Sequence, residues 1–327
     1  MGKVYFSKHI EKILEKLDYS RLGKKVAIKL HFGDKGCVTY LNPEIVRKIF
    51  GKVKSLGKEV KLVETNVLYR GSRTTRKDHL KTAREHGFDM PIDILDGEKG
   101  EEFIEVDGKK LGKGIKEYDS MIVVSHFKGH PMAGFGGSIK NLGMGLASRA
   151  GKLQMHSIVN PIVKNGCTAC KTCIENCNAN AIKIINGKAE IDSEKCEGCA
   201  MCIAVCPEGV IDVPWENATA EELQKGIVEY VDGVFKIIPK GKMIFINVLE
   251  KITKDCDCFS IKQEPIIEDI GILAGEDLII DKASLELVNE KSNGKFEKLN
   301  PSGKYQLEYA KEKGLMEDKY EIVDLDK

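Results

Sequence analysis

The sequence lacks any long apolar run. No hydrophobic stretch approaches the roughly 18 residues that a membrane-spanning helix needs, and the charged first residues do not resemble a signal peptide. Neither sign of charge predominates, since 51 lysines and arginines stand against 50 aspartates and glutamates. That balance excludes a protein whose main activity is to bind nucleic acid through a basic face. We expect a cytoplasmic protein that binds neither membrane nor nucleic acid.

Two cofactor signatures are also missing: the chain has no Walker phosphate loop (GxxxxGK followed by Ser or Thr) and no flavin fingerprint. What it has is cysteine. There are 11 cysteines, and eight of them fall between Cys167 and Cys206. A chain of 327 residues, 42% of them hydrophobic, can fold on an apolar core without disulfides. Clustered cysteines in such a cytosolic chain are typical of metal ligands.

The rest of the chain alternates strand and helix patterns. β-Branched runs at 26–30, 60–63, 92–95 and 121–124 are separated by helical patterns at 43–56 and 75–86. The pattern resumes after 213, with helices from 219 to about 234 and at 277–290, and strands at 243–248 and 270–273. This order predicts an α/β fold, a mainly parallel sheet with flanking helices. Residues 1–163 and 214–327 would form one domain, interrupted by a small α+β insert at 164–213.

The insert is an internal repeat. Each cysteine of its first run has a counterpart 29 residues later in the second. Three cysteines separated by two residues can surround one face of a 4Fe-4S cluster, and the fourth, expected at the start of a short helix, reaches the other cluster. Cluster I would therefore use Cys167, Cys170, Cys173 and Cys206. Cluster II would use Cys196, Cys199, Cys202 and Cys177. The alternative, two structural zinc sites, usually shows CxxC pairs with a longer gap.

This insert resembles the bacterial-type two-cluster ferredoxins over about 45 residues. The resemblance implies a ferredoxin-like fold with two 4Fe-4S clusters and low-potential, one-electron transfer. Pro207 follows the last cysteine, as in that family, whereas Asn178 takes the corresponding place in the first run.

Polar side chains follow the predicted strands, where open parallel sheets bind their ligands. We predict catalytic roles for Lys29, His31, His126, His130 and Lys140, and cofactor contacts for Arg70 and Arg73. A structural polar role is the alternative for each of them. A glycine-rich turn precedes a predicted helix, whose first amides would suit a phosphate or carboxylate. This anion or cofactor site would use Gly134, Gly136, Gly137, Lys140 and Asn141; a glycine-lined crossing of packed elements is the alternative.

The remaining cysteines suggest a third metal site. Cys256 and Cys258 are two residues apart and could reach one zinc, nickel or iron ion together with Cys37 or a histidine. The alternative is a pair of reduced thiols whose pKa the neighbouring acidic residues raise. Cys37 by itself, in a loop flanked by glycine, is predicted to be inert.

Four segments together resemble one family, the uncharacterised iron–sulfur center proteins built on domain of unknown function 362. The segments are VAIKLHFGDKG, NVLYRGSRTTRKDHL, HFKGHPMAGFGGSIKNLGMGLASRAGK and DCDCFSIKQEPIIEDIGILAGEDLIIDKA. This resemblance covers nearly the whole chain and implies its architecture, but no generally assigned reaction.

The string HPMAGFGGSIK also looks like the HxxAGxxGGxK stretch of nickel-pincer lactate racemases. That resemblance implies His130 as acid/base, Lys140 as the anchor of a nucleotide-derived cofactor, and His156 as a nickel ligand. The second catalytic histidine has no match here, and the racemases lack the cysteine-rich insert.

Three functions compete. We favour an iron–sulfur oxidoreductase whose clusters deliver electrons to a site at the carboxyl edge of the sheet, which predicts one cluster near residues 126–140. A ferredoxin-like carrier with a docking domain and a racemase-like enzyme with structural clusters are the alternatives. The expected partner is a redox protein or a small-molecule anion, and the oligomeric state is left open.

Overall fold

One eight-stranded sheet organises the larger domain. The computed structural model describes residues 1–156, 160–301 and 303–327. The strands run in the order β16-β1-β15-β14-β7-β2-β3-β4. Their bounds are β1 (Gly2–Ser7), β2 (Lys25–Lys29), β3 (Glu59–Glu64), β4 (Ile92–Ile94), β7 (Ser120–His126), β14 (Met243–Leu249), β15 (Gly271–Gly275) and β16 (Tyr320–Asp324).

Five neighbouring strands, from β14 through β7, β2 and β3 to β4, are parallel. β15 runs antiparallel to both of its neighbours, and β16 lies parallel to β1 at the far edge. The predicted mainly parallel sheet is thus confirmed. The carboxyl ends of the five parallel strands share one edge, where Lys29 ends β2 and His126 ends β7.

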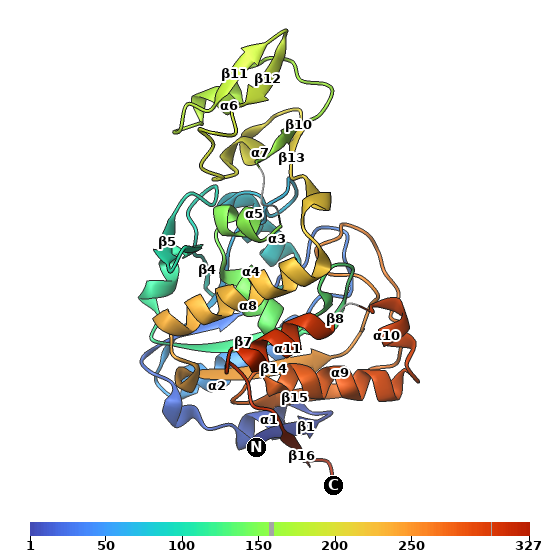
Figure 1. Ribbon diagram of the computed structural model, residues 1–327. Helices are drawn as coiled ribbons and strands as arrows, with labels where there is room; N and C mark the ends of the chain where they lie inside the picture. The colour runs from blue at the N-terminus through green and yellow to red at the C-terminus, as the bar shows by residue number, and fades with distance from the viewer. Residues whose placement is uncertain (157–159, 302) are drawn as a thin grey trace.

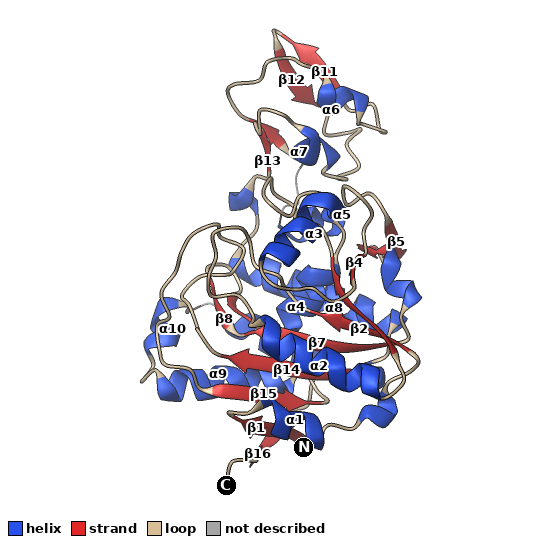
Figure 2. Cartoon of the chain, turned by 180° about the vertical axis from the view of Figure 1, so that it is seen from behind, coloured by secondary structure: helices blue, strands red, loops and turns tan. Residues whose placement is uncertain are grey.

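Helices cover both faces of the sheet (Figures 1 and 2). One layer contains α1 (Ile10–Lys16), α2 (Pro43–Ser55) and α3 (Arg76–Glu85); the other contains α4 (Ser138–Leu146), α8 (Ala220–Ile237), α9 (Ile279–Lys291) and α11 (Lys304–Glu312). Successive residues of β7 alternate between two cores: Met121 and Val123 belong to one, Ile122 and Val124 to the other. A strand buried on both faces explains the continuous apolar run.

Local sequence signals fix several helix ends. Asn42 caps α2 by accepting the amide of Glu44, with Pro43 in the first turn. Thr219 and Glu222 form a capping box at the start of α8. Both caps depend on residue types within a few positions of the helix start.

The remaining elements are short, apart from α5. A hairpin within residues 97–116 is formed by β5 (Phe103–Val106) and β6 (Lys109–Gly112). A second hairpin, β8 (Lys128–His130) with β9 (Gly134–Gly136), follows β7 directly, and α5 (Arg149–His156) leads towards the insert. The tail forms α10 (Lys295–Leu299), α11 and β16. Single 3-10 turns cover Tyr19–Arg21, Lys113–Glu117, Trp215–Asn217 and Lys240–Lys242. Among the described helices none is long and apolar enough to cross a membrane.

The insert projects from the rest of the molecule (top of Figure 1). It begins at β10 (Ile162–Val163), which pairs with β13 (Ile211–Asp212), two residues earlier than the expected boundary. Between them lie α6 (Thr172–Glu175), the hairpin of β11 (Ile182–Ile185) and β12 (Lys188–Ile191), and α7 (Met201–Val205). The fourth cysteine of each run was expected to begin a short helix. This was wrong: Cys177 and Cys206 follow the ends of α6 and α7, because the third cysteine of each run already lies in the helix.

Candidate functional site

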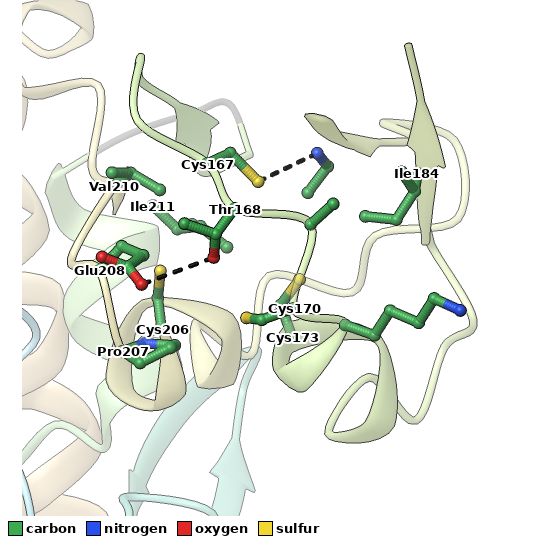
Figure 3. Close-up of a pocket in the computed structure, with 13 residues that line it drawn as sticks. Cys167, Thr168, Cys170, Cys173, Ile184, Cys206, Pro207, Glu208, Val210 and Ile211 are labelled. Carbon is green, nitrogen blue, oxygen red and sulfur yellow. Dashed lines mark hydrogen bonds between the residues drawn. The ribbon is translucent and has the colours of Figure 1, made fainter. Parts of the chain in front are cut away.

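Two cavities in the insert are lined by cysteines from both runs. One is bordered by Cys167, Cys170 and Cys173 of the first run and by Cys206 of the second (Figure 3). The other is bordered by Cys196, Cys199 and Cys202 of the second run and by Cys177 of the first. All eleven cysteines are free thiols. The donor set and its spacing fit iron–sulfur binding.

The backbone around these cavities repeats as the sequence does. Left-handed residues occur in three pairs, each 29 residues apart: Ala169 with Gly198, Lys171 with Ala200, and Asn180 with Gly209. Two thiols of the first run also accept backbone amides, since Ala181 N lies 3.3 Å from Cys177 Sγ and Ala189 N lies 3.4 Å from Cys167 Sγ. Amide donors of this kind stabilise thiolates.

The insert contacts the loop that follows β3. Arg70 donates through Nη1 to the carbonyl of Pro207, and Leu68 packs in the same apolar cluster as Cys173 and Cys206. Arg70 was expected to contact a cofactor at the sheet edge. The structure places it against the insert instead, where its guanidinium finds the carbonyl of Pro207 as acceptor.

Lys29 lies in the centre of the sheet edge. Its ammonium is fully buried and donates to Glu64 Oε1, Asn141 Oδ1 and the carbonyl of Leu30, each at 2.8 Å. These three bonds use all three of its protons. Asn141 in turn donates to the carbonyl of Val124 and to Ser125 Oγ. Both residues hold strands and α4 together, so the geometry gives them a positioning role.

Arg73 is a second buried cation at this edge. Its guanidinium lies 3.3 Å from Asp34 Oδ2 and donates to the Tyr69 hydroxyl at 3.0 Å. His31 lies among these charges, and its Nδ1 accepts the amide of Gly33. Burial, aided by the positive charges of Arg73, Lys128 and Lys140, holds the pKa of His31 well below its usual value. His31 is therefore neutral at pH 7.

Asp257 lies between His126 and Lys128. Its Oδ2 is 2.8 Å from His126 Nδ1 and 3.3 Å from Lys128 Nζ. His126 Nε2 is 2.9 Å from the carbonyl of Glu250. A carbonyl oxygen only accepts, so Nε2 donates to it. The charges of His126 and Lys128 lower the pKa of Asp257 despite its burial, so the carboxylate is ionised.

Sequence reasoning missed Asp257, although its position between two cysteines was a signal. Asp257 and Cys258 lie in a turn, in which the amide of Phe259 donates to the carbonyl of Cys256 at 3.1 Å. Asp257 points towards His126 and Lys128, and the flanking thiols of Cys256 and Cys258 meet elsewhere. There they are joined by His130: one ligand atom from each of these three residues lies within 4.8 Å of the others. Lys140 Nζ lies 4.0 Å from Cys256 Sγ.

The pKa values of Cys256 and Cys258 differ from those expected for the alternative of two reduced thiols beside acidic residues. Neighbouring acidic residues were expected to raise the pKa of both thiols. For Cys256 this was wrong: a hydrogen bond from the Cys258 thiol, aided by the charges of Lys140 and Lys128, lowers its pKa well below the usual value. The same bond raises the pKa of Cys258. Burial and the charge of Lys140 hold the pKa of His130 well below its usual value.

The first turn of α4 was expected to bind an external phosphate or carboxylate. The structure corrects this, because the buried carboxylate of Asp281 already accepts the amides of Ser138 and Ile139, at 2.7 and 2.8 Å. Gly137 permits the contact, since a Cβ there would lie 2.5 Å from Asp281 Oδ1. Nothing in the sequence around Asp281 signalled this role. Gly134, at φ +72°, turns the hairpin, and Gly136 lies beside the stems of Lys128 and Lys140.

Two predicted metal ligands lie outside the group of three. The Cys37 thiol is buried between Thr39 Oγ1 at 3.5 Å and Asp257 Oδ1 at 3.8 Å, and burial raises its pKa. The His156 ring meets that of Trp215 edge-on, with centroids 5.0 Å apart. Burial and the charge of Lys140 lower the pKa of His156 to about 3.

A family model described as a domain of unknown function (DUF362) matches residues 26–286. The chain belongs to the DUF362 family. Over 55 residues the DUF362 chain is also 42% identical to one subunit of the ion-translocating oxidoreductase complex of Methanosarcina acetivorans. This match covers 17% of the chain and only 21% of the Methanosarcina protein.

Two solved structures resemble the DUF362 chain in fold. The lactate racemase apoprotein from Thermoanaerobacterium thermosaccharolyticum is 15% identical, with a TM-score of 0.42, over 89% of this chain and 58% of the racemase. A protein from Thermotoga maritima is 12% identical, with a TM-score of 0.41, over 87% of this chain and 57% of that one. The chain thus spans less than two thirds of each. A likeness at these identities concerns the fold and says nothing of activity.

Proposed function

We propose that this DUF362 protein holds two 4Fe-4S clusters in its insert and transfers electrons between a redox partner and the site at the carboxyl edge of its sheet. One observation carries the proposal: each cavity of the insert is lined by three cysteines of one run and the fourth of the other. Such an exchange of the fourth ligand is the arrangement expected for paired clusters.

The residues present fit this cofactor. Each cavity offers four thiols and no other metal-binding side chain in its lining except a peripheral glutamate, Glu208 or Glu197. When bound, 4Fe-4S clusters supply one-electron transfer at low potential. Cysteines 170 and 199 are exposed, so each cavity has a side that a redox partner can approach.

A hydrogen-bonded connection joins the insert to the sheet edge. Arg70 donates to the carbonyl of Pro207, the residue after Cys206. The neighbouring hydroxyl of Tyr69 donates to the carbonyl of Cys258 at 3.1 Å. Two hydrogen bonds and the peptide between Tyr69 and Arg70 therefore link Pro207, which follows the proposed ligand Cys206, with the Cys256–Cys258 loop. This link favours the hypothesis that electrons reach the sheet edge over the hypothesis that the α/β domain serves only to dock a partner.

The partial relative supports the same proposal, because its name describes a subunit of an oxidoreductase complex. We place the protein in the cytoplasm, where free thiols remain reduced. Its partner would be a redox protein at the insert, with a small anion as the ligand of the sheet edge, where Lys140 makes no ion pair with a carboxylate of the described residues.

Anaerobic purification with iron, sulfide and electron paramagnetic resonance analysis tests the proposal. Two clusters predict about eight irons and about eight acid-labile sulfides. Cys167→Ser and Cys206→Ser should alter the same resonance signal, and Cys196→Ser and Cys177→Ser the other one. Cys37→Ser, a buried thiol outside the insert, should alter neither.

A colourless anaerobic preparation without labile sulfide would overturn the proposal. If Cys206→Ser instead altered the signal that Cys196→Ser alters, the exchange of fourth ligands would be wrong.

A further inference from the structure

A group of metal-ligand side chains lies in the α/β domain, away from the eight cysteines of the insert. It consists of His130 on β8 and of Cys256 and Cys258 in the loop between β14 and β15. One ligand atom from each lies within 4.8 Å of the other two. Cys256 is 2% exposed and His130 8%. Two sulfurs and one ring nitrogen are a donor set typical of zinc and of other borderline-soft divalent metals.

The loop is held in place by backbone contacts that do not use its thiols. The carbonyl of Cys258 accepts Tyr69 Oη, and the carbonyl of Cys256 accepts Gln263 Nε2 at 3.3 Å. The amide of Asp34 donates to the carbonyl of Asp257 at 2.9 Å. Together with the ion pairs of the Asp257 side chain, these bonds fix both cysteines on one side of the loop. A metal would therefore find the two thiols already assembled.

We propose that Cys256, Cys258 and His130 bind one divalent transition metal, of the class that takes thiolate and imidazole ligands. Three protein ligands leave one coordination position for water or a small ligand, as in catalytic zinc sites. The charges agree with this assignment: two thiolates neutralise the metal, and the Lys140 ammonium, 4.0 Å from Cys256 Sγ, favours the thiolate form of that ligand.

His130 is the weakest of the three ligands. Its Nδ1 accepts the amides of Met132 and Ala133, at 3.2 and 2.9 Å. The neutral ring therefore carries its proton on Nε2. To bind a metal through Nε2, the ring must move that proton to Nδ1 and lose both hydrogen bonds from the amides. Metal-binding histidines usually donate from their second nitrogen, whereas this one accepts. We expect the two cysteines to contribute more to affinity than His130.

The test titrates zinc into the anaerobic protein with its iron retained, against a chromophoric chelator. Wild type should bind one equivalent of zinc. Cys256→Ser and Cys258→Ser should each weaken binding by about 100-fold or more, and His130→Gln by about tenfold. Two matched controls, Cys37→Ser and His156→Gln, should bind zinc as wild type does. X-ray absorption of the zinc-bound protein should report two sulfur ligands.

The iron content of every variant is measured in the same samples, so a loss of the clusters is distinguished from a loss of this site. Wild-type affinity in both serine variants would overturn the proposal. So would a chain about 2 Da lighter, with Cys256 and Cys258 joined in a disulfide and no zinc bound. Wild-type affinity in His130→Gln alone would remove His130 from the ligand set.

Discussion

Lys140 Nζ lies 4.0 Å from the sulfur of Cys256, although 116 positions separate the two residues. The sequence suggested each for a different reason, Lys140 as part of an anion-binding helix start and Cys256 as half of a cysteine pair. The fold places them in one site because α4 and the loop after β14 both begin near the carboxyl edge of neighbouring parallel strands. The lysine therefore acts on a thiolate, and the anion at the helix start is Asp281.

Asp257→Asn should destabilise the α/β domain by about 3–5 kcal/mol, because it leaves the buried charges of His126 and Lys128 without their counterion. Urea unfolding followed by circular dichroism measures this. Asp255→Asn is the matched control, since the carboxylate of Asp255 makes no ion pair with the described residues, and it should change stability by less than about 0.5 kcal/mol. Equal effects of the two variants would contradict the buried-charge account.

Gly137→Ala should cost about 2–3 kcal/mol, because the new Cβ would displace Asp281 from the first amides of α4. Gly136→Ala is the neighbouring control. The nearest atom to its Cβ would be Lys128 Cε at 3.4 Å, an ordinary contact, so we expect a change of less than about 1 kcal/mol. The urea midpoints of the two variants, at unchanged slope, make the comparison. A Gly137 variant as stable as the Gly136 variant would mean that Asp281 does not need this close approach.

The pH dependence of stability should reveal Asp281. Burial raises its pKa to about 6, above the ordinary value of 3.8. Between about pH 4 and 6 the folded chain keeps a proton that the unfolded chain has released, so stability from this group falls as pH rises. Relative to Asp281→Asn, the free energy of unfolding of wild type should fall by about 3 kcal/mol across that window. A difference that grows with pH would show that the amides of Ser138 and Ile139 outweigh burial.

Arg70→Ala should loosen the contact between the insert and the loop after β3. Loss of its hydrogen bond to Pro207 should make the amides of residues 208–210 exchange with solvent about fivefold faster, equivalent to about 1 kcal/mol. Hydrogen exchange with mass spectrometry measures the rate in this segment. Arg76→Ala, which removes an exposed arginine paired with Asp93, should leave it unchanged. Unchanged exchange in the Arg70 variant would show that the insert is held by other contacts.

The sequence by itself determined the elements and the cysteine repeat. Apolar runs separated by helical patterns predicted β2, β3 and β7. The caps at Asn42 and Thr219 depend on side chains only a few residues away. Local hydrogen bonds and periodicity decide such features. The spacing of the eight insert cysteines likewise limits which thiols can lie together, because each run spans only a few turns of chain.

Only the tertiary structure decided what fills the sheet edge. Asp281 reaches the start of α4 from α9, and Asp257 joins His126 to Lys128 across more than a hundred residues. Buried charges must find partners wherever the fold brings them, and no local pattern records that choice. The fold likewise decided that Lys29 and Asn141 bind each other and that Arg70 binds the insert. It also placed His130 beside Cys256 and Cys258, which are distant in sequence.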